Sequence, residues 1–317
     1  MTTRGHLERD ARFLFSPWRR PPAFVVTGSG GFVGRVLTRE LRGPWQALHL
    51  APGDWRRRIE STRFRDATVI HLAAPAHASS ADAELHDHDT HGKTAFLASA
   101  AARGGARRMV FLSSVKAIGE ETAGTPFTTE TAPRPIDAYG RAKLAAEHAL
   151  AEASREFSME HVIVRAPLVL GAGARGNLAS LMRLCDSPWP LPFAAIDNRR
   201  SFVHVADLAR LLVQCAQAPQ AAARTYLAAH ENPFSTPGIV GSIRAALGRP
   251  PRLFKCESAT LEAWGRRIGR PALVQRLTRS LEVDASAASR DLGWSARHGL
   301  EDSVREMALA YRAMRRP

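Results

Sequence analysis

The chain has 317 residues, 45% of them hydrophobic and 23% charged, which is the composition of a soluble globular protein with one large or two coupled domains. Its formal net charge of +14 would suit a nucleic-acid partner, but the arginines are scattered and no stripe of basic and aromatic residues is present, so we do not expect nucleic-acid binding. No apolar run approaches the roughly 18–20 residues that span a bilayer, and three distant cysteines without a CxxC pair predict a cytoplasmic protein with reduced thiols and no zinc site.

The first 22 residues are rich in arginine and interrupted by prolines. They lack the continuous apolar segment of a secretory signal. We therefore expect residues 1–22 to form a basic, disordered extension.

From residue 23 on, short apolar runs alternate with amphipathic stretches. Helices are expected directly after residue 34, from about 90 to 103, and from 138 to about 157. The pattern predicts strands at 24–26, 47–50, 68–72, 108–112 and 161–164. Such alternation is typical of an α/β protein with a Rossmann-type, doubly wound parallel sheet, which binds ligands beyond the carboxyl ends of its strands.

After Arg165 proline and glycine become frequent, and we expect a smaller, irregular C-terminal part that binds the substrate. Its helical patterns cover 205–217, 237–247, 260–268 and 300–314, and a strand at 226–229 should return to the main sheet. The predicted division is a dinucleotide-binding domain at 23–171, to which 201–229 returns, and a substrate-binding part made of 172–200 and 230–317.

A glycine-rich turn follows the first strand and reads TGSGGFVG over residues 27–34. In this context it predicts a dinucleotide site, because backbone N–H groups and a helix N-terminus can approach a pyrophosphate. The predicted cofactor contacts of the turn are Gly28, Gly31, Phe32, Val33 and Gly34. Asp66 and the strand end Leu72, Ala73 and Ala74 are expected to form the floor under the adenine ribose.

The choice between NAD and NADP is usually made just after the second strand, where a carboxylate binds the ribose hydroxyls or an arginine accepts the 2′-phosphate. Here Asp54, Arg56 and Arg57 all lie in that segment. Arg35 adds weight to NADP, but both cofactors stay open.

Tyr139 and Lys143 stand four residues apart in a chain that holds only three tyrosines and four lysines. Four residues is about one helical turn, so both side chains lie on one helix face. An ammonium beside a phenol stabilises the phenolate, and we expect Lys143 to lower the pKa of Tyr139 so that it can exchange a proton with an alcohol or carbonyl oxygen.

One rival pattern is a cluster of histidine and aspartate at 86–89, with His91 and the upstream His77. Its spacing fits no helical zinc motif, so we expect no metal.

These motifs together resemble the extended short-chain dehydrogenase/reductases, in particular their epimerase/dehydratase/reductase group for nucleotide sugars. The family motif TGxxGxxG is met by Gly28, Gly31 and Gly34, its catalytic serine by Ser114, and its YxxxK by Tyr139 and Lys143. The stretches 113–120, 165–171 and 196–205 are most similar to reductases that act on a 4-keto precursor of UDP-N-acetylquinovosamine.

The resemblance implies an NAD- or NADP-dependent reduction of a UDP-4-keto-6-deoxy-HexNAc in surface-polysaccharide synthesis, and a homodimer. It implies Ser114, Tyr139 and Lys143 as catalytic residues and Ser114, Asn177 and Arg200 as substrate contacts. Arg276 or Arg279 could add a second phosphate contact.

The sequence departs from the family at Asp89, where an asparagine usually supports the proton relay, and at Ala67, where the adenine-side aspartate is shifted to Asp66. Three alternatives stay open: a UDP-sugar 4-epimerase with tightly bound NAD, a reductase of steroid-like ketones, and a non-catalytic dinucleotide-binding regulator.

Overall fold

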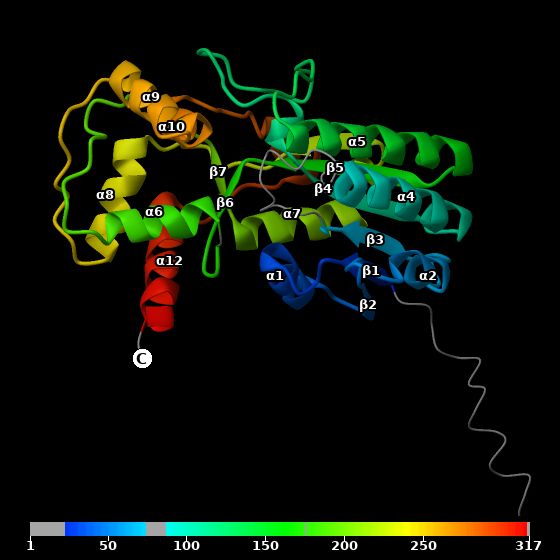
Figure 1. Cartoon of the computed structure of the whole chain (residues 1–317). Helices are drawn as coiled ribbons and strands as arrows, with labels where there is room; N and C mark the ends of the chain where they lie inside the picture. The colour runs from blue at the N-terminus through cyan, green and yellow to red at the C-terminus, as the bar shows by residue number, and fades with distance from the viewer. Residues whose placement is uncertain (1–22, 74–86, 175, 316–317) are drawn as a thin grey trace, which may run out of the picture.

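The computed structural model describes residues 23–73, 87–174 and 176–315. Its centre is a six-stranded, all-parallel sheet in the order β2-β1-β3-β4-β5-β8 (Figure 1). The strands are β1 (Phe24–Thr27), β2 (Trp45–Leu48), β3 (Thr68–His71), β4 (Arg108–Ser114), β5 (Glu160–Ala166) and β8 (Arg224–Leu227). The predicted doubly wound α/β fold is confirmed.

Helices cover both faces of this sheet. Two of them, α1 (Phe32–Glu40) and α7 (Val205–Gln217), pack on one face, and α2 (Trp55–Glu60), α4 (Lys93–Arg103) and α5 (Ala138–Phe157) pack on the other (Figure 1). The four central strands, β1, β3, β4 and β5, bury apolar side chains on both faces, which explains their uninterrupted apolar runs in the sequence.

Several predicted boundaries were displaced. The second strand was expected at 47–50 and lies two residues earlier, and the returning strand was expected at 226–229 and also lies two residues earlier. Helix α2 was not foreseen, because its six residues are too few to establish a periodic pattern.

A second, two-stranded parallel sheet, which the sequence did not reveal, is formed by two segments that the predicted division assigns to the dinucleotide-binding domain. It pairs β6 (Leu168–Leu170) with β7 (Phe202–His204). Around it lie α6 (Asn177–Cys185), α8 (Thr236–Ala246), α9 (Ser258–Arg267), α10 (Pro271–Thr278) and α12 (Leu300–Arg315), whereas α11 (Ser286–Leu292) packs against β8 of the main sheet. Helices α7, α8, α9 and α12 were predicted within two residues, whereas α6, α10 and α11 were missed.

The chain returns to the main sheet through α7, which packs on α1, and through β8. Trp294, just beyond α11, also belongs to the core of the main sheet, so the segment around it is not confined to the C-terminal part. The division into a dinucleotide-binding and a substrate-binding part remains our proposal. In the part of the chain that the structure describes, no helix is both long and apolar enough to cross a membrane.

Candidate active site

The glycine turn joins β1 to α1 at the carboxyl edge of the sheet. Gly28 has φ +70°, and a Cβ there would lie 3.0 Å from the backbone nitrogen of Ala73. A Cβ on Gly34 would lie 2.1 Å from the carbonyl oxygen of Gly28, so only glycine permits this packing. A Cβ on Gly30 would meet none of the described residues within 4 Å. The turn is therefore closed toward the sheet, and none of the described residues covers its outer side at Gly30.

Gly31 is the N-cap of α1 and has no side-chain cap, and Phe32 and Val33 are the first residues of the helix. The N-terminus of a helix carries partial positive charge and outward N–H groups, which suit a pyrophosphate. The donor set therefore fits a dinucleotide, with Gly28, Gly31, Phe32, Val33 and Gly34 as its proposed contacts.

The strand end that was predicted to lie under the adenine ribose is held in place by the hydroxyl of Thr27, which the sequence did not indicate. Thr27 Oγ1 accepts the backbone N–H groups of Leu72 and Ala73 at 3.2 and 3.3 Å. It also lies 2.6 Å from Nδ1 of His71, and since two donors already point at this oxygen, its own proton goes to the ring. Leu72 and Ala73 thus lie beside the glycine turn, whereas Ala74 lies outside the described residues.

His71 is a neutral, structural histidine. Its Nε2 lies 2.9 Å from Thr94 Oγ1, which itself donates to the carbonyl of Thr90. Complete burial, followed by the charge of Lys143, lowers the pKa of His71 to about 3. The ring therefore links the end of β3 to α4 without carrying charge.

Ser114, Tyr139 and Lys143 come together at the same edge of the sheet. Ser114 is the last residue of β4, and its hydroxyl hydrogen-bonds the phenol of Tyr139, the second residue of α5. Lys143 lies one turn further along α5, with Nζ 5.8 Å from the Tyr139 ring centroid, and donates to the carbonyl oxygen of Leu112 at 2.7 Å. The spacing in the sequence predicted that Tyr139 and Lys143 share a helix face, and the family resemblance implied Ser114.

The predicted protonation states, however, were wrong. Burial, followed by the negative charge of Asp137, raises the pKa of Tyr139, and only the hydrogen bond from Ser114 opposes this. Burial also lowers the pKa of Lys143 to about 7. A lysine that is largely stripped of water and points at a carbonyl stabilises a phenolate poorly. Burial and the charge of Asp137 therefore favour the protonated form of Tyr139.

A carboxylate-rich cluster next to these residues was also missed. Asp137 caps the N-terminus of α5 by accepting from the backbone N–H of Gly140 at 2.7 Å, and it pairs with Lys116. Lys116 also contacts Glu120 at 3.1 Å, and its backbone N–H donates to Ser114 Oγ. The motif at 113–120 contains these residues, but only the fold brings Asp137 to them.

Arg200 lies on the far side of this cluster. Its guanidinium donates to the carbonyl of Arg279 at 2.9 Å. Burial and then the nearby positive charge of Arg276 lower the pKa of Arg200 to about 10, while Glu120 opposes this. Two guanidinium groups at one partly buried position favour an anion between them.

The structure separates the two candidates for a second phosphate contact. Arg279 is already paired with Glu121 and with Glu262, the latter at 3.4 Å. Arg276 has a buried Nε without a hydrogen-bond partner among the described residues. Asn177, the third predicted substrate contact, is the exposed first residue of α6 and directly follows the N-cap residue Gly176.

Asp66 does not join the other predicted cofactor residues. It precedes β3, is exposed, has φ +61° and donates its N–H to the carbonyl of Gly105. This position is at the amino edge of the sheet, about 13 Å of extended strand away from the glycine turn. The expected contact between Asp66 and the adenine ribose is therefore not supported.

Asp89 lies in the π-helical turn η1 (Asp87–Gly92) and is committed to Lys93 at 2.7 Å and to His88 at 2.9 Å. Burial would raise the pKa of Asp89, but the hydrogen bonds from Lys93 and His88 hold it below its usual value. Lys93 also donates to the carbonyl of Leu50 and so fastens the loop after β2. Asp89 thus supports the loop rather than reaching the phenol.

The histidine cluster weighed as a metal site is not assembled in the described residues. Asp87 pairs with His91 at 3.0 Å, and His88 with its neighbour Asp89. His77 and His86 lie outside the described residues.

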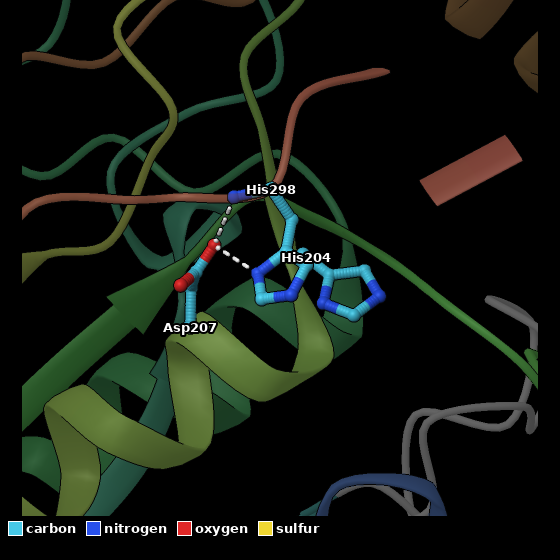
Figure 2. Close-up of side chains that lie close together, drawn as sticks. All are labelled: His204, Asp207 and His298. Carbon is cyan, nitrogen blue, oxygen red and sulfur yellow. Dashed lines mark hydrogen bonds and ion pairs between the residues drawn. The ribbon is translucent and has the colours of Figure 1, made fainter. Parts of the chain in front are cut away.

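A different group, His204, Asp207 and His298, has ligand-type atoms within 4.8 Å of one another (Figure 2). Asp207 Oδ2 accepts both the backbone N–H and the ring Nδ1 of His298, at 2.9 and 3.1 Å, and Oδ1 accepts from Arg210 at 2.6 Å. The two histidine rings stack at 4.3 Å.

We interpret His204, Asp207 and His298 as a structural cluster, which we call the latch, and not as a metal centre. Nδ1 of His204 accepts from the N–H of Ala206, and its Nε2 faces Glu306 at 3.0 Å. A metal ion would have to displace these partners as well as those of Asp207. The latch ties the N-terminus of α7 to the segment before α12.

The fold and the trio of Ser114, Tyr139 and Lys143 beside a glycine turn define a dinucleotide-dependent oxidoreductase scaffold. The model of the NAD dependent epimerase/dehydratase family matches residues 24–229, and the chain belongs to this family. The expectation of NAD or NADP as cofactor is confirmed at this level.

The chain is 33% identical to a UDP-glucose 4-epimerase from Vibrio cholerae, over 92% of this chain and 96% of the relative. It is 24% identical to dTDP-6-deoxy-L-talose 4-dehydrogenase (NAD(P)(+)) from Kitasatospora kifunensis, over 93% of this chain and 97% of the relative. The structure of a Thermotoga maritima UDP-glucose 4-epimerase with UDP-glucose superposes with a TM-score of 0.72, at 18% identity, over 92% of this chain and 99% of that one.

Proposed function

We propose that this chain transfers hydride between a nicotinamide cofactor and C4 of a UDP-linked sugar. The observation that carries the proposal is that Ser114, Tyr139 and Lys143 come together at the sheet edge that also holds the glycine turn. Arg200 and Arg276 lie close to each other and near Glu120, which pairs with Lys116. The names of the relatives support the substrate class, since they act on UDP- and dTDP-linked sugars.

Each residue of the trio has a distinct task. When bound, the cofactor supplies or accepts the hydride. Tyr139 exchanges a proton with the sugar oxygen at C4, and Ser114 hydrogen-bonds the same oxygen and holds it in place. Lys143 holds the ribose of the nicotinamide end. Arg200 and Arg276 bind the diphosphate, because a guanidinium grips phosphate oxygens in pairs.

Between reduction and epimerisation, the sequence resemblance favours reduction, and burial together with Asp137 favours the protonated form of Tyr139 that a reduction uses. A phenol that carries its proton can give it to the oxygen of a 4-keto sugar as hydride arrives at C4. The first half of an epimerisation needs a phenolate to remove the proton of a 4-hydroxyl group. We therefore propose a 4-keto reductase, with a UDP-4-keto-6-deoxy-HexNAc as the substrate that the sequence resemblance implies.

The second candidate is a UDP-sugar 4-epimerase, and the Vibrio relative favours it. The same residues would oxidise C4, let the keto sugar turn, and reduce it on the other face. Here the cofactor is regenerated in each cycle and stays bound.

The deciding experiment follows the absorbance of the reduced nicotinamide during turnover. A reductase consumes one NADH or NADPH for each 4-keto sugar. An epimerase interconverts UDP-glucose and UDP-galactose with no net consumption and with NAD that copurifies. Activity with neither substrate class, together with no inhibition by UDP, would refute a nucleotide-sugar function and favour a small ketone.

A further inference from the structure

A buried ion pair lies directly behind the trio. Glu147 is on α5, one turn beyond Lys143, and its carboxylate is gripped by the fork of Arg165 in β5. The Arg165 nitrogens lie 2.6–3.2 Å from both carboxylate oxygens, and Ser113 donates its hydroxyl to one of them. Glu147 is only 2% exposed and Arg165 7%.

This pair connects the three elements that carry the site. Ser113 and Arg165 are directly opposite each other in the β4–β5 ladder, so their side chains share one face, and Glu147 caps both from the helix above. Ser113 precedes Ser114, and Leu112 accepts the hydrogen bond of Lys143. The pair thus sets the position of α5 against the ends of the two strands.

Stability alone does not explain a pair in this place. Replacing a buried ion pair by well-packed apolar residues is often neutral or stabilising, so such pairs are weak contributors to folding. A carboxylate one helical turn from a buried ammonium, however, stabilises the charge on that ammonium.

Among the described residues, Glu147 is the carboxylate that acts on the charge of Lys143. Nζ lies 4.5 Å from the ring of Phe111 in β4, and His71 in β3 is neutral. Tyr139 on the same helix is protonated, and Arg165 is itself positive and bound to Glu147. Burial lowers the pKa of Lys143, and Glu147 opposes that shift.

We propose that Glu147 is a positioning residue of the reaction, which, clamped by Arg165 and Ser113, keeps the Lys143 ammonium charged and in place beside Tyr139. This inference builds on the proposed function, because it concerns the residue that would hold the nicotinamide ribose. Its physical content, a charge held on Lys143 by Glu147, is measurable without substrate.

The test uses the small number of lysines. The chain has four, Lys93, Lys116, Lys143 and Lys255, so lysine labelled with ¹³C at Cε gives few signals, and Lys143→Arg assigns the one of interest. The midpoint of its pH titration is compared between the unaltered protein and Glu147→Gln. We expect the midpoint to fall by about one pH unit in the variant, which is a roughly tenfold lower ratio of ammonium to amine at a given pH.

The matched control lies on the same two strands. Arg108 and Glu160 form an ion pair at their opposite, amino-terminal ends, with 2.6 Å between nitrogen and oxygen. Glu160→Gln should leave the Lys143 midpoint unchanged. An equal shift in this variant would mean that a general loss of packing, not the carboxylate of Glu147, moves the signal.

If Glu147→Gln does not fold, the double variant Glu147→Gln/Arg165→Met removes both charges of the pair, and the midpoint should fall in the same direction. A Lys143 midpoint that stays in place in a folded Glu147 variant overturns the proposal. Because the titration needs no sugar nucleotide, it reads the same whether or not the proposed activity is found. In an active protein, kcat should fall at neutral pH in Glu147→Gln and not in Glu160→Gln.

Discussion

Two buried polar groups of this molecule, the latch at the start of α7 and the trio on α5, have opposite characters. In the latch, both carboxylate oxygens of Asp207 have protein donors, and the pKa of Asp207 lies below its usual value because those hydrogen bonds outweigh burial. In the trio, burial dominates and shifts both Tyr139 and Lys143 toward their neutral forms. The hydrogen bonds of Asp207 are all made within the chain and stabilise the fold, whereas the burial-driven shifts of Tyr139 and Lys143 occur beside Ser114 at the carboxyl edge of the sheet, which is where shifted pKa values indicate a functional site.

The largest expected effect is the loss of turnover in Tyr139→Phe. Removing the phenolic proton should lower kcat by a factor of about 10²–10⁴, which is the usual contribution of general acid catalysis. Steady-state kinetics gives the ratio. Tyr311→Phe is the matched control, because Tyr311 in α12 donates its hydroxyl to Asp186 at the end of α6, away from the trio, and the change should leave kcat as it is. An unchanged kcat in a folded Tyr139→Phe protein would show that Tyr139 is not the general acid.

The next effect concerns the glycine turn. In Gly34→Ala the added Cβ would overlap the carbonyl of Gly28, so the turn must shift and its N–H groups lose their alignment. We expect the Kd for the dinucleotide to rise more than about tenfold, which is 1.4 kcal/mol, as measured by quenching of intrinsic fluorescence.

The control for this change is Gly241→Ala in α8, where a Cβ meets none of the described residues within 4 Å. It should leave the Kd unchanged and raise stability by roughly 0.5–1 kcal/mol, since alanine is the better helix former. Equal dinucleotide affinity in both variants would show that the turn does not bind the cofactor.

A third comparison tests the arginines. Arg276→Met should raise KM for the UDP-sugar by roughly 10- to 100-fold, the equivalent of one hydrogen bond to a charged group, with little change in kcat. Arg279→Met removes an arginine that is already paired with Glu121 and Glu262, and KM should change little. A larger rise in KM for Arg279→Met than for Arg276→Met would assign the phosphate contact to Arg279 instead.

The smallest catalytic effect is expected in the latch. Asp207→Asn should lower the free energy of unfolding by about 1–3 kcal/mol, because buried donors lose their acceptor, while kcat per folded molecule stays the same. Denaturant titration and kinetics on the same sample measure both quantities.

The pH dependence of that loss follows from the sign of the shift. The pKa of Asp207 is lower in the folded chain than in the unfolded one, so its contribution is present above the unfolded pKa and disappears as pH falls through the folded pKa. The stability difference between the unaltered protein and Asp207→Asn should therefore shrink below about pH 4. If the stability difference between the two proteins stays constant down to low pH, Asp207 does not stabilise the fold as an ionised carboxylate.

The sequence predicted the sheet, the glycine turn and the pairing of Tyr139 with Lys143 because each rests on a local signal, whereas Ser114 was implied by the family resemblance. Apolar runs reveal buried strands, and a spacing of four places Tyr139 and Lys143 on one helix face. The same locality explains the error at Asp66: it adjoins β3 in sequence but lies at the wrong edge of the sheet.

The remaining features depend on contacts that a sequence does not show. Three-residue strands such as β6 and β7 carry no periodic pattern and form through their pairing with each other. The pKa of Tyr139 depends on burial and on Asp137, which reaches the site only when the N-terminus of α5 is folded. The distinction between Arg276 and Arg279 likewise rests on Glu121, far away in the chain.

The most direct measurement of the central claim is an isotope transfer. NADH or NADPH deuterated at C4 of the nicotinamide is incubated with the protein and a UDP-4-keto-6-deoxy sugar, and the product is analysed by mass spectrometry and NMR. We expect one deuterium at C4 of the sugar, and almost none when Tyr139→Phe replaces the unaltered protein. A product without deuterium at C4, or equal transfer by Tyr139→Phe, would contradict the central claim.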